Sequence, residues 1–116
     1  MGARIALAAA LCALVLVSFL APAALAQKST EDGLRDCEKL AAKKFKQDNP
    51  RFKGFDIDRA GVNEDKFADK VGTQFVSTVY HGSAVYKVSD TFQQVRFICL
   101  HGGFGKGAVF VYTLPR

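Results

Sequence analysis

The chain has few of the residues that enzymes most often use for catalysis or metal binding. Its 116 residues include two histidines and three cysteines. His81, His101 and Asp90 could together hold a divalent cation, but no motif spacing links them. No serine lies in a G-x-S-x-G elbow, the turn that presents the nucleophile of an α/β-hydrolase. The composition therefore predicts a protein with no metal, no cofactor and no catalytic residue.

No apolar run reaches the length of about 20 residues that a membrane-spanning helix needs. Residues 5–20 lack charge, but Pro22 follows them, and Ala24-Leu25-Ala26 has the small residues of a signal-peptidase site. These features predict a signal peptide, residues 1–26, cleaved before Gln27. The alternative is a retained membrane anchor. An exported chain would reach the periplasm, or be secreted if the cell has no outer membrane.

Cleavage would leave one small domain, residues 27–116, and would lower the formal charge from +5 to +4. Cys12 would be lost, so Cys37 and Cys99 would remain as an even pair, which predicts a disulfide in an exported chain. The bond closes a loop of roughly 60 residues and is worth ~4 kcal/mol in the chain-entropy model. A domain of this size has a thin core, so a covalent link is a useful addition.

Residues 29–47 are predicted to form an amphipathic helix. Ser29 or Thr30 can cap its start, and Pro50 disfavours its continuation. Apolar residues recur at spacings of three and four and so define one buried face: Leu34, Cys37, Ala41 and Phe45.

The opposite face of this helix is basic, and further cations follow just beyond its end. We interpret these residues as a candidate anion- or partner-binding face, with a solvated helix surface as the alternative. Phe45 and Phe52 are expected to interleave with the charges, a pattern found in nucleic-acid-binding proteins, but export argues against nucleic acid. The face consists of Arg35, Lys39, Lys43, Lys46, Arg51 and Lys53.

After Pro50, β-branched and aromatic residues alternate with turn residues, which predicts short strands. Residues 63–67 are expected to form a loop or a helical turn, and residues 81–83 a turn. One helix followed by strands predicts an α+β fold, with an N-terminal helix packed on a meandering antiparallel sheet of four to five strands. The expected strands are 52–58, with an extension towards Val62, then 72–80, 84–88, 94–101 and 108–114.

The disulfide fixes which side of the sheet faces the helix. Because side chains alternate along a strand, Val95 and Phe97 should point towards the helix with Cys99, and Ile98 and Leu100 should point away. In the last strand, Val109 and Val111 face one way and Phe110 and Tyr112 the other. Both faces are therefore apolar, whereas a half-solvated antiparallel sheet should alternate apolar with polar. We predict that Ile98 and Leu100 form an apolar interface, closed by curling of the sheet, by a homodimer or by a ligand.

The segment Gly102-Gly-Phe-Gly-Lys-Gly107 has the composition of a phosphate-binding loop. A strand follows it, however, where such a loop would open a helix, and no Ser or Thr follows Lys106 to hold a metal. We interpret it as a flexible hairpin loop whose glycines adopt positive φ.

The stretches DKFADKVGTQFVSTV (65–79) and VRFICL (95–100) resemble small exported proteobacterial proteins of unknown function, which share a cysteine in an N-terminal helix and another in a late strand. This resemblance implies a periplasmic setting and no activity. The segment GSAVY (82–86) is similar to small periplasmic lysozyme inhibitors. Its order of Gly and Ser and the N-terminal helix depart from that family, so no functional residue is carried over.

These observations favour a periplasmic, non-enzymatic binding or protein-interaction module. Its partner is expected to be a protein or an envelope component. A second hypothesis is a small periplasmic hydrolase, which would place His81 or His101 beside a carboxylate and a hydroxyl. A third is an envelope-associated structural or stress protein that binds anionic surfaces through the basic helix face.

Overall fold

The computed structural model describes residues 30–115, so the predicted signal peptide lies outside the described residues. Residues 32–116 form one compact unit. A helix covers residues 30–48. It is followed by β1 (Phe52–Ile57), β2 (Asn63–Val71), β3 (Gln74–Val88), β4 (Thr91–His101) and β5 (Ala108–Pro115). No helix within the described range is long and apolar enough to cross a membrane.

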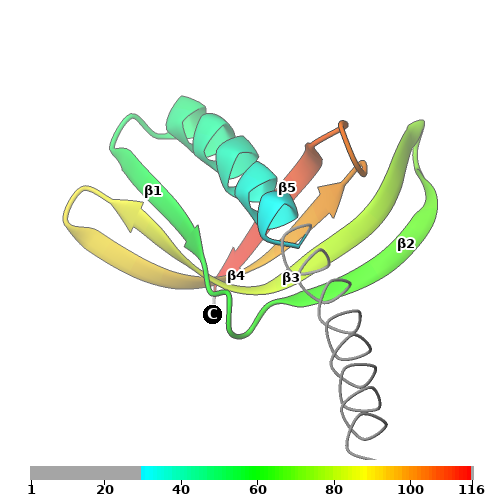
Figure 1. Cartoon of the computed structure of the whole chain (residues 1–116). Coiled ribbons are helices and arrows are strands. Elements are labelled where there is room, and N and C mark those ends of the chain that lie inside the picture. The colour runs from blue at the N-terminus through cyan, green and yellow to red at the C-terminus, as the bar shows by residue number, and fades with distance from the viewer. Residues whose placement is uncertain (1–29, 116) are drawn as a thin grey trace, which may run out of the picture. The chain divides into compact units, whose positions relative to one another are not determined.

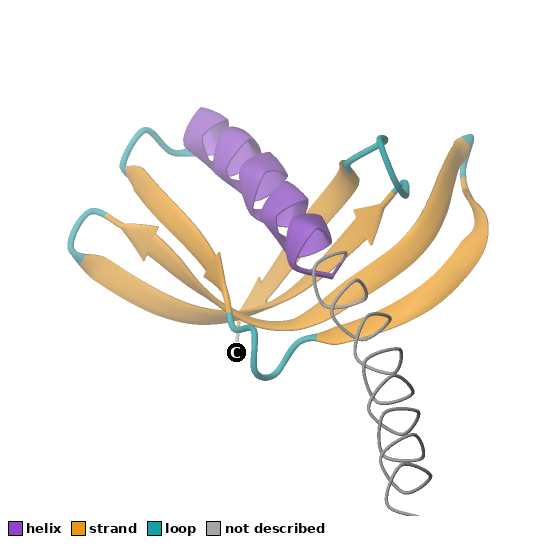
Figure 2. Ribbon diagram, viewed as in Figure 1, coloured by secondary structure: helices purple, strands orange, loops and turns teal. Residues whose placement is uncertain are grey.

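The five strands form one antiparallel sheet in the order β1-β3-β4-β5, and β2 also pairs with β3. β1 lies along the second half of β3, from Ala84 to Val88, while β2 lies along the first half, from Gln74 to His81. The two short strands therefore lie end to end on the same edge of β3. The sheet curls towards the helix, which fills its concave side (Figures 1 and 2). The predicted α+β class, with a helix-to-strand disulfide, is confirmed.

Two local predictions are wrong. Residues 63–67 belong to strand β2 rather than to a loop or a helical turn. All nine residues of β2 are exposed, so the segment carries no burial pattern that could reveal a strand, and its pairing with β3 determines its conformation.

Residues 81–83 lie within the single long strand β3 instead of forming a turn. A Cβ at Gly82 would lie 3.1 Å from the carbonyl oxygen of Gly61 and 3.2 Å from Cα of Val62. Gly82 therefore permits the close approach of the segment between β1 and β2, which is a common use of glycine inside a strand.

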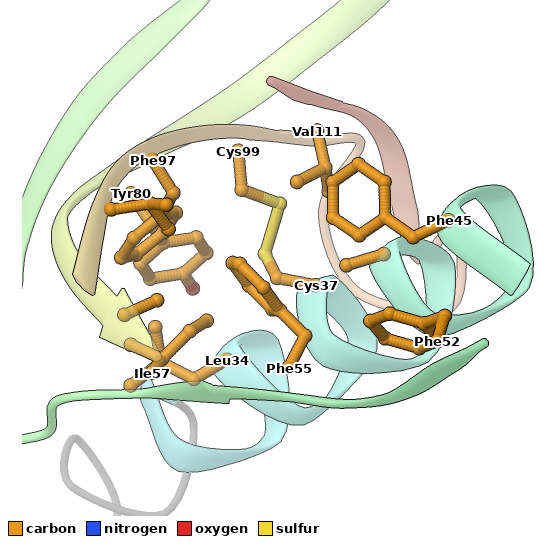
Figure 3. Packing of buried hydrophobic residues seen from close by; sticks show 13 residues of the cluster. Leu34, Cys37, Phe45, Phe52, Phe55, Ile57, Tyr80, Phe97, Cys99 and Val111 are labelled. Carbon is orange, nitrogen blue, oxygen red and sulfur yellow. A yellow bond between two sulfur atoms is a disulfide. The ribbon is translucent and has the colours of Figure 1, made fainter. Parts of the chain in front are cut away.

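The core lies between the helix and the concave face of the sheet. The predicted helix face is confirmed, because Leu34, Cys37, Ala41 and Phe45 are all buried. The Cys37–Cys99 disulfide joins the helix to β4 across a Cα–Cα distance of 6.1 Å. Figure 3 shows it in the middle of the core, between Tyr80 and Phe97 on one side and Phe45 and Val111 on the other.

An aromatic cluster closes the core where the helix ends. The ring centroid of Phe45 lies 5.9 Å from that of Phe52, 5.7 Å from that of Phe55 and 5.2 Å from that of Tyr86. The expectation that Phe45 and Phe52 interleave with surface charges is therefore wrong. Both rings are buried, because the chain turns at residues 49–51 and brings β1 back beside the helix.

A polar link also joins the helix to the end of β1. Glu38 accepts two hydrogen bonds from the Arg59 guanidinium, at 2.8 and 2.9 Å, and one from the backbone N–H of Ile57 at 3.0 Å. These bonds hold the segment after β1 against the helix and help to set where β2 begins.

Candidate functional site

The outer face of the sheet, opposite the helix, exposes a row of large apolar side chains. Ile98 is 39%, Phe110 44% and Tyr112 50% exposed, whereas Leu100 is half-buried. Ile98 pairs with Tyr112 and Leu100 with Phe110 in the β4–β5 register. The predicted orientation of Ile98 and Leu100 away from the helix is thus confirmed, and Phe110 and Tyr112 extend the same surface. We call these four residues the outer row.

The two aromatic rings of the outer row are parallel. The centroids of Phe110 and Tyr112 lie 6.4 Å apart, with an interplanar angle of 10°. The sheet bends towards the helix, so its curvature leaves this outer face uncovered within the described residues (Figure 1). The sequence left three ways to cover this face, namely curling of the sheet, a homodimer or a ligand. Curling does not cover the outer row, because the sheet bends the other way.

A hollow of about 460 Å³ lies beside the outer row. Its apolar lining includes Val79, Ile98 and Leu114, and its polar lining comes from three strands: Asn63 of β2, His81 and Ser83 of β3, and Arg96 of β4. The volume is within the range of about 300–1,000 Å³ that small-ligand pockets occupy. The hollow is open, and is thus suited to receive a side chain from a partner.

The side chains of His81 and Arg96 differ in how they are held at this hollow. His81 Nε2 lies 2.7 Å from Asp65 Oδ2, so a carboxylate already accompanies it. Arg96 is exposed, and its side chain forms no hydrogen bond or ion pair with another residue of the range 30–115. Its guanidinium is available to a carboxylate from outside the domain, in the bidentate geometry that Arg favours.

The second histidine lies on the opposite side of the sheet. His101 is buried, and its Nε2 lies 2.8 Å from Asp36 Oδ2 on the helix. The backbone N–H of Gly103 donates to His101 Nδ1 at 3.0 Å, so Nδ1 carries no proton and Nε2–H donates to Asp36. His81 and His101 face opposite sides of the sheet, so the cation site that the sequence allowed for them with Asp90 does not form within the described residues. Both ring nitrogens of His101 are occupied, which makes it a link between helix and β4.

Tyr80 packs beside this link, with its ring centroid 6.1 Å from that of His101. Its side chain is almost fully buried. Burial, together with the nearby carboxylates of Glu64 and Asp36, raises the pKa of Tyr80 to about 12. The phenol therefore stays neutral well beyond the pH at which a solvated tyrosine ionises.

We expect the ionisation of Tyr80 to lower the stability of the domain at alkaline pH. The native state holds this proton more tightly than the unfolded chain, so its contribution is complete below pH 10 and is lost as the pH rises through 12. Urea unfolding measures the free energy of unfolding below pH 10 and again near pH 12. Its decrease between the two should be smaller for Tyr80→Phe than for the unchanged protein. The phenolate absorbance that appears last in a titration should also be missing from this variant. If Tyr80→Phe lost one tyrosine from its titration curve but kept the phenolate absorbance that appears last, the assignment would be wrong.

The predicted basic face is present on the solvent side of the helix and at the start of β1. All six predicted residues are exposed: Arg35, Lys39, Lys43, Lys46, Arg51 and Lys53. Lys39, Lys43 and Lys46 form no ion pair with another described residue, so their charges are available to an anionic partner. The buried Phe45 and Phe52 contribute no aromatic surface to this face.

The β5 edge of the sheet and the β2 part of the opposite edge are protected against pairing with another strand. At the β5 edge, Lys44 Nζ donates to the carbonyl oxygen of Val111 at 3.3 Å and lies 5.1 Å from the centroid of the Phe110 ring. At the β2 edge, the register shifts between Lys66 and Asp69, where Ala68 has a φ of 52°. Bulges and lysines of this kind discourage edge-to-edge association.

No group of three or more His, Cys, Asp or Glu side chains that could hold a metal occurs among residues 30–115. Comparison of the chain with protein-family models, with curated proteins and with solved structures gives no match. The candidate site therefore rests on its own geometry, and the resemblance to small exported proteins stays a prediction.

Proposed function

We propose that this domain is a non-enzymatic protein-interaction module of the periplasm, and that the outer row is its contact surface. The observation that carries the proposal is the exposure of Ile98, Phe110 and Tyr112 on one continuous sheet face. Protein interfaces are enriched in aromatic residues and Arg, and Arg96 lies at the hollow beside this row.

The protected edges favour the same conclusion. A partner strand added to β5 would have to displace Lys44 from the carbonyl oxygen of Val111, and one added to β2 would meet the bulge at Ala68. Face-to-face contact requires neither change. The outer row therefore offers a partner a lower-cost surface than strand β5 or strand β2.

A periplasmic setting is supported by the disulfide, because such bonds persist in oxidising compartments. Cys37 and Cys99 are both fully buried, so the bond is part of the core and fits an exported protein.

The hydrolase hypothesis is less favoured. His81 and Asp65 form the His–carboxylate half of a triad, and Ser83 lines the same hollow. Ser83, however, makes no side-chain hydrogen bond to His81 within the described chain, and a nucleophile needs its base within hydrogen-bond reach. His101 has no free ring nitrogen with which to accept a proton.

The test uses a photo-crosslinking residue at position 112 in the cells that produce the protein. We expect a discrete covalent adduct with one protein, and about tenfold less of it when Ile98→Asp is added, because an apolar anchor is lost and a charge must be desolvated. Phe92→Asp is the matched control, since Phe92 is 69% exposed at the far end of the same sheet face and should leave the adduct unchanged.

An adduct of twice the chain mass would identify a second copy as the partner. The absence of any adduct, or an adduct that Ile98→Asp leaves at full yield, would overturn the proposal.

A second candidate is an envelope-associated protein that binds anionic surfaces through the basic face. Lys39, Lys43 and Lys46 favour it, because none forms an ion pair with another described residue. Such binding would weaken with added salt, since the charges are solvent-exposed.

A further inference from the structure

One end of the domain carries two projecting tips, which we call the distal end. Strand β3 pairs with β4 only from Thr78 onward, where Thr78 faces His101. Residues 74–77 of β3 and the end of β2 thus extend beyond β4 as a hairpin. The loop of residues 102–107, between β4 and β5, projects at the same end (Figure 1).

Two backbone hydrogen bonds within the 102–107 loop define a turn. The N–H of Gly102 donates to the carbonyl oxygen of Gly107 at 2.9 Å, and that of Lys106 to the carbonyl oxygen of Gly103 at 3.0 Å. Gly105, the third residue of this turn, has a φ of 76°, as a type II turn requires. Phe104 occupies the second position, and the N–H of Gly103 fastens the loop to His101. The predicted positive φ is found at Gly103, Gly105 and Gly107.

This turn presents Phe104 to solvent without any covering side chain. Phe104 has an exposed fraction of 107%, the highest among the large apolar residues of the described chain. Phe67, Val71 and Phe75, on the neighbouring hairpin, are each between 45% and 47% exposed. These four side chains lie largely outside the core, and exposed apolar groups gathered at one end of a domain are typical of a surface that contacts a partner or a membrane.

Basic residues accompany the apolar tips. Lys106 follows Phe104 within the loop, and Lys66 and Lys70 lie on the hairpin; all three are exposed. Asp69 is the acidic residue among them, while Asp65 is paired with His81 towards the outer face. The two tips themselves, residues 66–77 and 102–107, thus combine aromatic side chains with three lysines and one aspartate, a net positive charge that complements an anionic surface.

We propose that the distal end docks on an anionic lipid bilayer, with Phe104 entering the interfacial region and the lysines contacting lipid phosphates. The apolar groups lie on two separate tips, and Phe104 does not line the hollow beside the outer row. A protein partner would need a surface complementary to both tips, whereas a fluid bilayer accommodates them without a fixed shape. The apolar Phe ring is favourably transferred out of water, and apolar side chains flanked by lysines are typical of surfaces that enter the membrane interface.

This inference goes beyond the proposed function and uses a different surface. Docking by the distal end would hold the domain at a membrane while the outer row, on the outer face of the sheet, remains open to its protein partner.

The test uses the absence of tryptophan from the chain. In Phe104→Trp the new residue is the sole tryptophan, so its fluorescence reports on position 104 alone. The protein is purified from the cells that naturally produce it, in the form that these cells yield. It is then mixed with vesicles of phosphatidylcholine and phosphatidylglycerol in equal parts. We expect the emission to shift to shorter wavelength, and the shift to weaken in pure phosphatidylcholine. Phe92→Trp, at the opposite end of the sheet, is the matched control and should show no shift.

Co-sedimentation with the same vesicles measures the contribution of the side chain. Phe104→Ser should lower the partition coefficient about tenfold, because the free energy of transferring one Phe side chain is lost. Phe92→Ser should leave it unchanged, and so should Lys39→Glu with Lys43→Glu on the basic face. Circular dichroism checks that each variant is folded.

An unshifted Phe104→Trp emission in anionic vesicles, or equal partition of Phe104→Ser and the unchanged protein, would overturn the inference. Binding abolished by the two helix substitutions alone would assign the membrane contact to the basic face and would also overturn it. Ile98→Asp should bind vesicles normally and Phe104→Ser should crosslink normally, so the two proposals fail separately.

Discussion

Replacing Cys37 and Cys99 together with alanine is expected to lower the free energy of unfolding by about 4 kcal/mol. The two cysteines are 62 residues apart in the sequence, so the bond removes much of the conformational freedom of the unfolded chain. Domains have a total stability of about 5–15 kcal/mol, and a loss of this size would leave much of the population unfolded at elevated temperature. Urea unfolding followed by circular dichroism measures the change.

Reduction of the unchanged protein provides the control for this variant. The reduced protein should unfold at nearly the same urea concentration as the alanine variant, and a reductant should have no further effect on the variant itself. If the paired replacement shifted the free energy of unfolding by less than about 1 kcal/mol, the disulfide would not be the main constraint on the unfolded chain, contrary to the loop-closure model.

Replacing Gly33 with alanine is expected to destabilise the domain by about 2–3 kcal/mol. Gly33 is buried in the helix, and a Cβ added there would overlap Tyr80 Oη and lie 2.7 Å from Tyr80 Cζ. Alanine favours a helix over glycine by about 1 kcal/mol, so an exposed helical glycine would show the opposite sign. The overlap dominates because Tyr80 is itself buried and has little room to move. Thermal and urea unfolding of Gly33→Ala measure the loss.

The double variant Gly33→Ala with Tyr80→Phe separates overlap from other causes. Removal of the hydroxyl relieves the closest contact, so Gly33→Ala should cost at least about 1 kcal/mol less in the Tyr80→Phe background than alone, a coupling typical of residues in contact. Equal costs in both backgrounds would show that the helix accommodates alanine by some other movement.

The elements that the sequence predicts well are those with one buried face. In the helix, the spacing of Leu34, Cys37, Ala41 and Phe45 matches 3.6 residues per turn, and all four are buried. In β4, alternation predicts both the buried Phe97 and the exposed Ile98. One side of each element faces the core, so its apolar residues recur in the sequence with the period of a helix or a strand.

The β2 strand and the hollow could not be predicted in this way. β2 buries no side chain, so its composition indicates a loop even though its backbone pairs along β3. The hollow joins Asn63, His81 and Arg96 from three strands, and their proximity depends on cross-strand register, which the sequence does not reveal. The His101–Asp36 link spans 65 residues and has no local signal either.

The complete exposure of β2 has a consequence for how accurately the hairpin forms. Sliding a strand by one position normally exchanges its core and solvent faces, which is costly. Since β2 has no core face, such slippage would bury or expose almost nothing on its own side. Correct alignment must then be enforced by the two-residue connection at Gly72, with its φ of 64°, and by the irregular step at Ala68. These two backbone positions keep β2 in register with β3, which side-chain packing cannot do here.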